Sequence, residues 1–157
     1  MALYVLDTGV LIGYVRRAPF AERIERDYAP AHPPNSALVP VVVEAELRSM
    51  ALQRQWQKAK LAKLDQLLRR IPKVDISHPS VVLRFAEIDA YRLGKLAARP
   101  LPAGMSTRTI GDNDLWVAAV ASVLNATLIT TDKDFDVLDG VFLNRIFVDP
   151  SSNPQSP

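Results

Sequence analysis

The stretch YVLDTGVLI, residues Tyr4–Ile12, decides how this chain is expected to fold. Leu3–Leu6 is typical of a short buried strand, and the residues from Thr8 onward are typical of a helix. Asp7 stands at the junction, where its carboxylate can cap the helix. Burial of an ionised carboxylate without a partner is costly, so Asp7 should lie at an edge of the fold, cap the helix or face a cation.

Outward from this junction, strand-like segments alternate with helical ones along a chain of 157 residues. Strands are expected at Leu3–Leu6, Ala37–Val39, Val74–Ser77 and Ala126–Thr130, and within Phe142–Val148. This alternation predicts an α/β fold with a central, mostly parallel sheet of four to five strands and helices on both faces. One domain is expected over residues 1–149, followed by a flexible, proline-rich tail at 150–157.

The expected helices connect these strands. They lie in the segments 8–17, 19–28, 41–55, 78–98 and 112–124, with a helical turn at 134–138 and a loop at 99–110. A further, basic helix ends before Pro72, because Leu61, Leu64 and Leu68 recur at helical spacing within a segment rich in Lys and Arg. Its outer face is either a solvated surface or a phosphate-facing one, and the spacing does not distinguish them.

Composition excludes several classes of protein. The chain has no cysteine, which rules out disulfides and thiolate metal sites. No segment approaches the roughly 20 apolar residues of a membrane span, and Arg16 and Arg17 follow the first apolar run, the reverse of a signal peptide. A cytoplasmic protein without membrane contact is therefore expected. The net charge of +2 gives little indication of partners.

Acidic residues gather where functional sites form in such sheets, beyond the carboxyl ends of the strands. Four groups follow strands or begin helices: Asp7; Glu44 and Glu46; Asp112 and Asp114; Asp132, Asp134 and Asp136. Two unit charges about 4 Å apart repel by roughly 4 kcal/mol at an effective dielectric constant of about 20. A convergent set therefore favours bound hard cations or shared protons, and oxygen ligands select Mg²⁺ or Mn²⁺ over zinc.

Each acid also has a structural explanation of its own. Asp7 can be a helix cap, and Glu46 can be a surface helix residue. Asp114 can be a first-turn acid favoured by the helix dipole, and Asp132 can belong to a turn. The specific order of the four groups argues for a shared role.

In this order, VLDTGVLI, VVVEAELRS, IGDNDLWVAAVA and TLITTDKDF resemble the motifs of PIN domains, and specifically of VapC-type ribonuclease toxins from VapBC toxin–antitoxin modules. The resemblance covers nearly the whole chain and implies a single PIN-like domain. It places the catalytic, metal-binding acids on Asp7, Glu46, Asp114 and Asp132. Asp134 matches an acid that joins the metal site in some members.

Three further positions follow from the resemblance. Asp112 is a candidate auxiliary ligand, and Thr130 matches a hydroxyl residue near the site. Gly9 departs from the family, which commonly has Asn there, so support for Asp7 is expected from Thr8 instead.

The implied activity is metal-dependent hydrolysis of RNA phosphodiester bonds with Mg²⁺ or Mn²⁺. The implied partners are the RNA substrate, a cognate VapB-like antitoxin and a second copy in a homodimer. Arg48, Arg99 and Arg108 are candidates for positioning RNA, although a structural ion pair explains each equally well. Trp56 is a candidate interface anchor, and Trp116 is expected in the core.

Alternatives remain at this point. A catalytically silent PIN-fold protein would bind RNA without cutting it, and metal binding would separate the two readings. Cleavage of DNA stays open, because metal-assisted chemistry does not select the sugar. A receiver-like or phosphatase-like enzyme would require a late lysine in a specific pattern, and Lys133 lacks that pattern.

Overall fold

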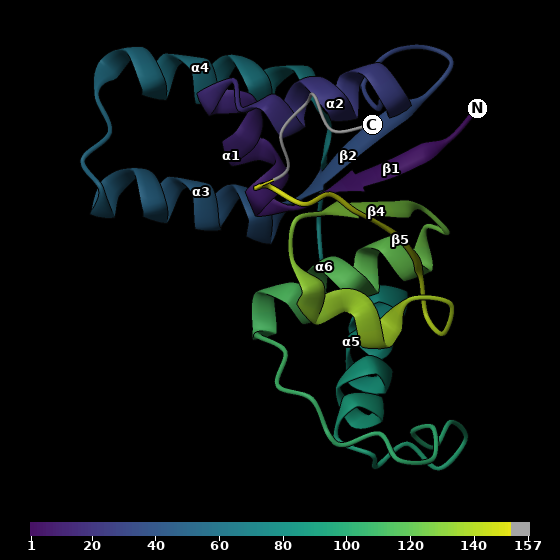
Figure 1. Cartoon of the computed structure of the whole chain (residues 1–157). Coiled ribbons are helices and arrows are strands. Elements are labelled where there is room, and N and C mark those ends of the chain that lie inside the picture. The colour runs from purple at the N-terminus through teal and green to yellow at the C-terminus, as the bar shows by residue number, and fades with distance from the viewer. Residues whose placement is uncertain (152–157) are drawn as a thin grey trace.

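The computed structural model describes residues 1–151, which contain one five-stranded sheet with helices around it (Figure 1). The strands are β1 (Leu3–Leu6), β2 (Ser36–Pro40), β3 (Lys73–Val74), β4 (Thr127–Thr130) and β5 (Asn144–Phe147). They run parallel in the order β3-β2-β1-β4-β5. The predicted α/β fold is confirmed, and β1 lies at the centre of the sheet.

The helices are α1 (Thr8–Arg16), α2 (Pro19–Tyr28), α3 (Val41–Gln53), α4 (Lys58–Arg70), α5 (Pro79–Arg92) and α6 (Asp112–Val123), and a 3₁₀ helix, η1, spans Lys133–Leu138. In Figure 1, α3 and α4 extend together away from the sheet, while α5 and the loop after it extend in another direction. The carboxyl ends of β1 and β4 meet at the angle between these two parts (Figure 1).

The core packs the central strands of the sheet against α6. Val5 on β1 and its register partner Leu128 on β4 are fully buried. Helix α6 is buried over most of its length, and its small residues Ala118, Ala119 and Ala121 have no exposed surface. Small side chains allow a helix to approach the sheet and its neighbours closely, so the start of α6 is held firmly beside β1 and β4.

Two predicted boundaries are wrong, and local capping explains both. The third strand covers Lys73–Val74 rather than 74–77, because the Asp75 carboxylate accepts a hydrogen bond from the Ser77 amide at 2.9 Å and turns the chain. Helix α5 ends at Arg92 rather than near residue 98. Gly94 has a φ of +69°, the left-handed conformation that terminates helices, and this pattern was missed.

None of the helices within residues 1–151 is long and apolar enough to cross a membrane. Residues 152–157, which hold most of the expected tail, lie outside the described residues. The domain boundary at residue 149 therefore stays a prediction.

Gly9 allows α1 to pass close to the loop after β4. A Cβ at this position would lie 2.1 Å from the Thr131 hydroxyl oxygen. We expect Gly9→Ala to lower the free energy of unfolding by about 1–3 kcal/mol, measured by urea denaturation. Because alanine exceeds glycine in helix propensity by about 1 kcal/mol, the double variant Gly9→Ala/Thr131→Ala should recover most of this loss. Equal losses in the single and double variants would contradict the steric explanation.

Candidate active site

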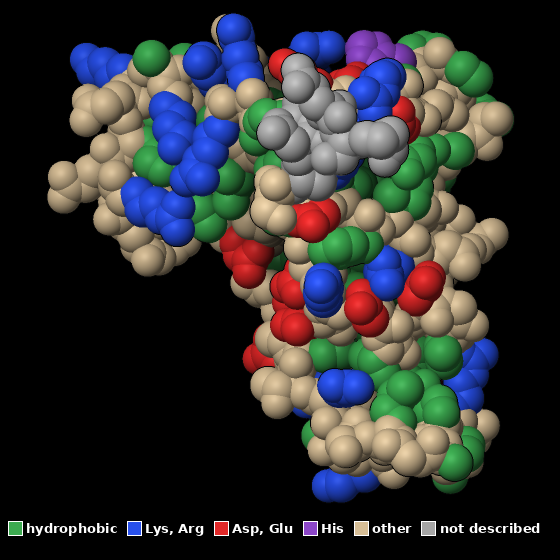
Figure 2. All heavy atoms as spheres, in the orientation of Figure 1, with side chains coloured by type: hydrophobic (Ala, Val, Ile, Leu, Met, Phe, Trp, Pro, Cys, Tyr) green, Lys and Arg blue, Asp and Glu red, His purple; other side chains and the backbone are tan. Residues whose placement is uncertain are grey.

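Parallel pairing of β1 with β4 brings distant acids together at one edge of the sheet. Asp7 follows β1, and Asp132 follows β4. Asp114 lies in the first turn of α6, Asp134 lies in η1, and Glu46 lies in α3. Acidic side chains gather in the angle between the two projecting parts of the molecule (Figure 2).

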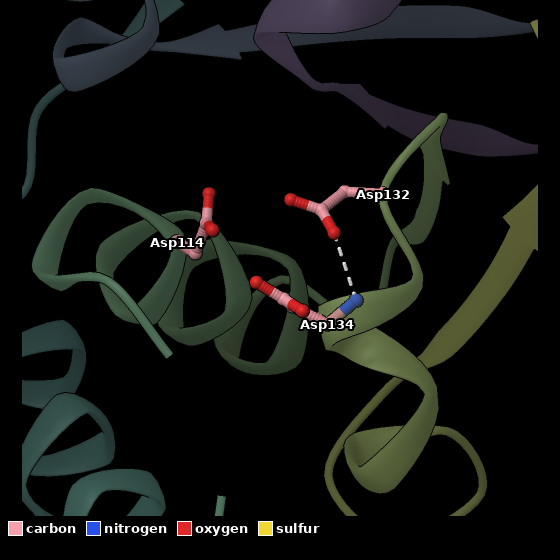
Figure 3. A group of neighbouring side chains, drawn as sticks. All are labelled: Asp114, Asp132 and Asp134. Atoms are coloured by element: carbon pink, nitrogen blue, oxygen red, sulfur yellow. Dashed lines mark hydrogen bonds between the residues drawn. The ribbon is translucent and has the colours of Figure 1, made fainter. Parts of the chain in front are cut away.

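Asp114, Asp132 and Asp134 form the most compact group. One carboxylate oxygen from each lies within 4.8 Å of the others, and the three side chains point toward one another (Figure 3). The Asp132 carboxylate accepts a hydrogen bond from the Asp134 amide at 2.8 Å, which caps η1 and fixes the turn between them. This turn places Asp134 near the edge of the sheet, close to Asp114 and Asp132.

Asp7 is buried beside this group. Its two carboxylate oxygens accept hydrogen bonds from the Thr8 amide and from the Thr130 hydroxyl, each at 2.7 Å. The Thr130 hydroxyl also accepts a hydrogen bond from the Asp132 amide at 3.0 Å. Burial raises the pKa of Asp7 to about 6, and the charges of Glu46 and Asp132 add to the shift.

Glu46 is held by donors from two other elements. The Thr8 hydroxyl donates to one carboxylate oxygen at 2.5 Å, and the Asn113 amide donates to the other at 2.8 Å. The expected support of Asp7 by Thr8 comes from the Thr8 backbone amide, together with the Thr130 hydroxyl. The Thr8 side chain supports Glu46, which was not expected. Sequence reasoning missed Asn113, and its position directly before Asp114 was the only available signal.

The carboxylates repel one another. Burial raises the pKa of Asp114 to about 7, with further contributions from Asp7, Asp132, Glu46 and Asp134 in that order. Burial and the charge of Asp132 also raise the pKa of Asp134. Such a cluster of oxygen ligands fits a hard divalent cation such as Mg²⁺ or Mn²⁺, because the cation would offset the repulsion.

The other acids singled out from the sequence lie elsewhere. Glu44 pairs with Arg48 and Lys73 at 3.5 and 3.9 Å. Asp136 pairs with Arg145 at 2.9 Å. Asp112 begins α6 but does not belong to the compact group among residues 1–151.

The three candidate arginines differ in their contacts. Arg48 pairs with Asp65 at 2.6 Å, and Arg99 donates to the Val141 carbonyl at 2.5 Å. Arg108 is held through its backbone, which exchanges hydrogen bonds with Arg92, each at 3.0 Å. Its guanidinium has no hydrogen bond or ion pair within residues 1–151, so it is available to a ligand.

Comparison with known proteins agrees with this geometry. The family model of the PIN domain matches residues 4–141. Ribonuclease VapC1 of Haemophilus influenzae (strain R2866) is 32% identical over 137 residues, which cover 85% of this chain and 90% of that protein.

Solved structures with a similar fold include two toxin–antitoxin proteins. The structure of VapBC-1 from nontypeable Haemophilus influenzae has a TM-score of 0.66 and 26% identity, covering 92% of this chain and 97% of that one. The structure of VapBC2 from Rickettsia felis, bound to a promoter DNA fragment, has a TM-score of 0.72. The match covers 94% of this chain and 99% of that one. Because VapBC2 is only 23% identical to this chain, the comparison with it shows a shared fold and nothing about function. The chain belongs to the PIN domain family and is a relative of the VapC ribonucleases.

Proposed function

We propose that this protein is a metal-dependent endoribonuclease toxin that hydrolyses RNA phosphodiester bonds. The observation that carries the proposal is the convergence of Asp114, Asp132 and Asp134 within 4.8 Å, beside the buried Asp7. The similarity to Ribonuclease VapC1 supports RNA as the substrate. Mg²⁺ or Mn²⁺ is the proposed cofactor, because every available ligand atom is an oxygen.

The five acids have distinct roles in this proposal. Asp114, Asp132 and Asp134 bind the cation, while Asp7 and Glu46 border it and complete its surroundings. A bound divalent cation lowers the pKa of water and stabilises negative charge on phosphate oxygens. Asp7, with a pKa of about 6, is mostly ionised at neutral pH. Asp114, with a pKa of about 7, is partly protonated without metal, so metal binding should release protons.

The proposed function is tested by incubation of the purified protein with total cellular RNA. Discrete fragments in Mg²⁺ or Mn²⁺ that disappear with EDTA would support a metal-dependent ribonuclease, and sequencing of their ends would identify the target. A DNA substrate of the same sequence tests whether the protein cleaves RNA in preference to DNA. Metal binding and RNA binding without cleavage would favour the catalytically silent alternative.

Glu46 should depend on its two donors for orientation. We expect Thr8→Val and Asn113→Ala each to lower kcat for RNA cleavage by about 10-fold or more, because loss of a hydrogen bond to a metal-site carboxylate commonly reduces metal affinity or activity by that amount. Thr8→Ser keeps the hydroxyl and should retain activity. Isothermal titration with Mn²⁺ would show weakened metal binding. Full activity in both variants would contradict a positioning role.

A VapB-like antitoxin and a second copy of the chain are the proposed protein partners. A hollow of about 440 Å³ between α3 and α4 has Leu52 and Trp56 among its apolar lining residues, with Arg48 and Gln55 beside them. Leu52 is 80% exposed, and this hollow is the proposed antitoxin contact. On α5, Val82 and Leu83 are 47% and 61% exposed, and this surface is the proposed homodimer contact.

Substitutions on the two proposed contact surfaces should have separate effects on dimerisation and on antitoxin binding. Leu83→Asp should convert a dimer into a monomer in light scattering and leave capture of a co-expressed antitoxin intact. Leu52→Asp should abolish that capture and leave the dimer intact. The reverse pattern would show that the two surfaces are exchanged.

A further inference from the structure

A cleft of about 380 Å³ opens beside the acidic site. Two segments line it: the loop before α6 contributes Met105, Arg108 and Thr109, and η1 contributes Lys133, Asp134 and Val137. Asp134 belongs both to this cleft and to the compact acidic group. The cleft is therefore continuous with the proposed metal centre.

We infer that this cleft binds one nucleotide of the RNA strand next to the bond that is cut, with Arg108 and Lys133 contacting its phosphate. This inference rests on the proposed function and specifies how the substrate is held. Both side chains are exposed, and they approach the cleft from different elements. Arginine and lysine supply the phosphate contacts that dominate affinity for nucleic acids.

The charges within the cleft favour a phosphate at its cationic end. The remaining acid that lines it, Asp136, is paired with Arg145 at 2.9 Å. The Arg108 guanidinium has no acidic partner within residues 1–151, and Lys133 lies 5.6 Å from the centre of the Phe147 ring. Among residues 1–151 neither cation forms an ion pair within 4.0 Å, although the charge of Lys133 also acts on Asp149, so both can contact a phosphate.

The walls of the cleft suit a nucleotide base. Met105 and Val137 supply apolar surface, and the methionine thioether makes favourable contacts with aromatic rings. The volume lies within the range of about 300–1,000 Å³ that is typical of small-ligand sites. A second basic hollow, of about 530 Å³, is lined by Arg17, Lys63 and Arg70, but none of the site carboxylates borders it. It is therefore a weaker candidate for the substrate next to the cut.

The salt dependence of RNA binding tests this inference. Binding is measured by fluorescence anisotropy with a labelled, random-sequence RNA of about 12 nucleotides, between about 50 and 200 mM salt. All proteins carry Asp114→Asn to prevent cleavage. The double variant Arg108→Ala/Lys133→Ala should reduce the slope of log K against log salt by about 0.7, the value for one lost phosphate contact on a single strand, and each single variant should reduce it by part of that amount. At low salt, affinity should fall several-fold.

Matched variants separate this effect from a general loss of charge. Arg108→Lys and Lys133→Arg keep the cation and should keep the slope. Arg26→Ala removes an equal charge from an exposed residue of α2 that borders neither basic hollow, and it should leave the slope unchanged. In the cleavage-competent protein, Arg108→Ala should raise KM more than it lowers kcat.

The outcomes distinguish this inference from the proposed function. Unchanged slopes in both alanine variants, together with RNA cleavage by the wild-type protein, would overturn the subsite and leave the nuclease assignment intact. Reduced slopes without any metal-dependent cleavage would support the subsite and contradict the assignment. A fall in the slope as large in Arg26→Ala as in Arg108→Ala would also overturn the subsite, because the effect would then come from the overall charge and not from a contact in the cleft.

Discussion

Asp114→Asn is expected to abolish RNA cleavage, by about 10³-fold or more, and at the same time to raise the Tm of the metal-free protein. Catalysis falls because a bound cation contributes several kcal/mol to the transition state, and each 1.36 kcal/mol corresponds to about tenfold in rate. Stability in EDTA rises because the charge of Asp114 is opposed by burial and by four neighbouring carboxylates. The variant should also lose the increase in Tm that Mg²⁺ or Mn²⁺ gives to the wild-type protein.

Asp112→Asn provides a matched control. Asp112 lies in the same first turn of α6 but outside the compact acidic group. This variant should keep both cleavage and the metal-induced shift in Tm. Loss of cleavage in Asp112→Asn with retention in Asp114→Asn would reverse the assignment of ligands. A fall in the Tm of Asp114→Asn in EDTA would show that repulsion does not govern the metal-free site.

The metal-free protein is expected to become less stable as the pH rises from about 4 to about 8. The pKa values of Asp7 and Asp114 are raised from 3.8 to about 6 and about 7. Between the unfolded and folded pKa values, the native state binds more protons than the unfolded state, so the free energy of unfolding decreases with increasing pH. Urea denaturation in EDTA at pH 5 and pH 8 measures this difference.

Saturating Mg²⁺ or Mn²⁺ should reverse this trend, because a cation binds the deprotonated carboxylates. At a metal concentration of about 100 times Kd, the native state gains roughly 2.7 kcal/mol. Asp114→Asn should flatten the pH dependence in EDTA. Equal stability at the two pH values in EDTA would contradict the raised pKa values.

Much of the fold was predictable because its signals are local. The apolar run at Leu3–Leu6, the capping position of Asp7 and the first-turn prolines at Pro19 and Pro79 each depend on a few neighbouring residues. The wrong helix boundary arose where a helix-ending residue lies within an apolar pattern. At Gly94 the left-handed conformation ends α5, although leucines lie on either side of it.

The site was predictable only in part, because its supporting contacts cross the fold. The order of the acid groups indicated a shared role, and Asp134 was suggested only by the resemblance to PIN domains. No spacing could show that Asn113 reaches Glu46, since the two are 67 positions apart. For the same reason, no spacing could show that the Thr8 hydroxyl reaches Glu46 while its backbone amide donates to Asp7. Tertiary contacts likewise decide which arginine is available to bind a ligand. Arg48 and Arg99 are held by side-chain contacts, whereas the Arg108 guanidinium has none within residues 1–151.

The hydroxyl of Thr130 joins the two halves of the chain at the centre of the site. It donates to Asp7, which lies 123 positions earlier, and it accepts from the Asp132 amide. A growing polypeptide therefore lacks the assembled carboxylate site until β4 and the loop after it have left the ribosome and paired with β1. Synthesis itself delays the activity proposed for this protein, so truncated translation products that end before Thr130 should be harmless to the RNA of the cell that makes them.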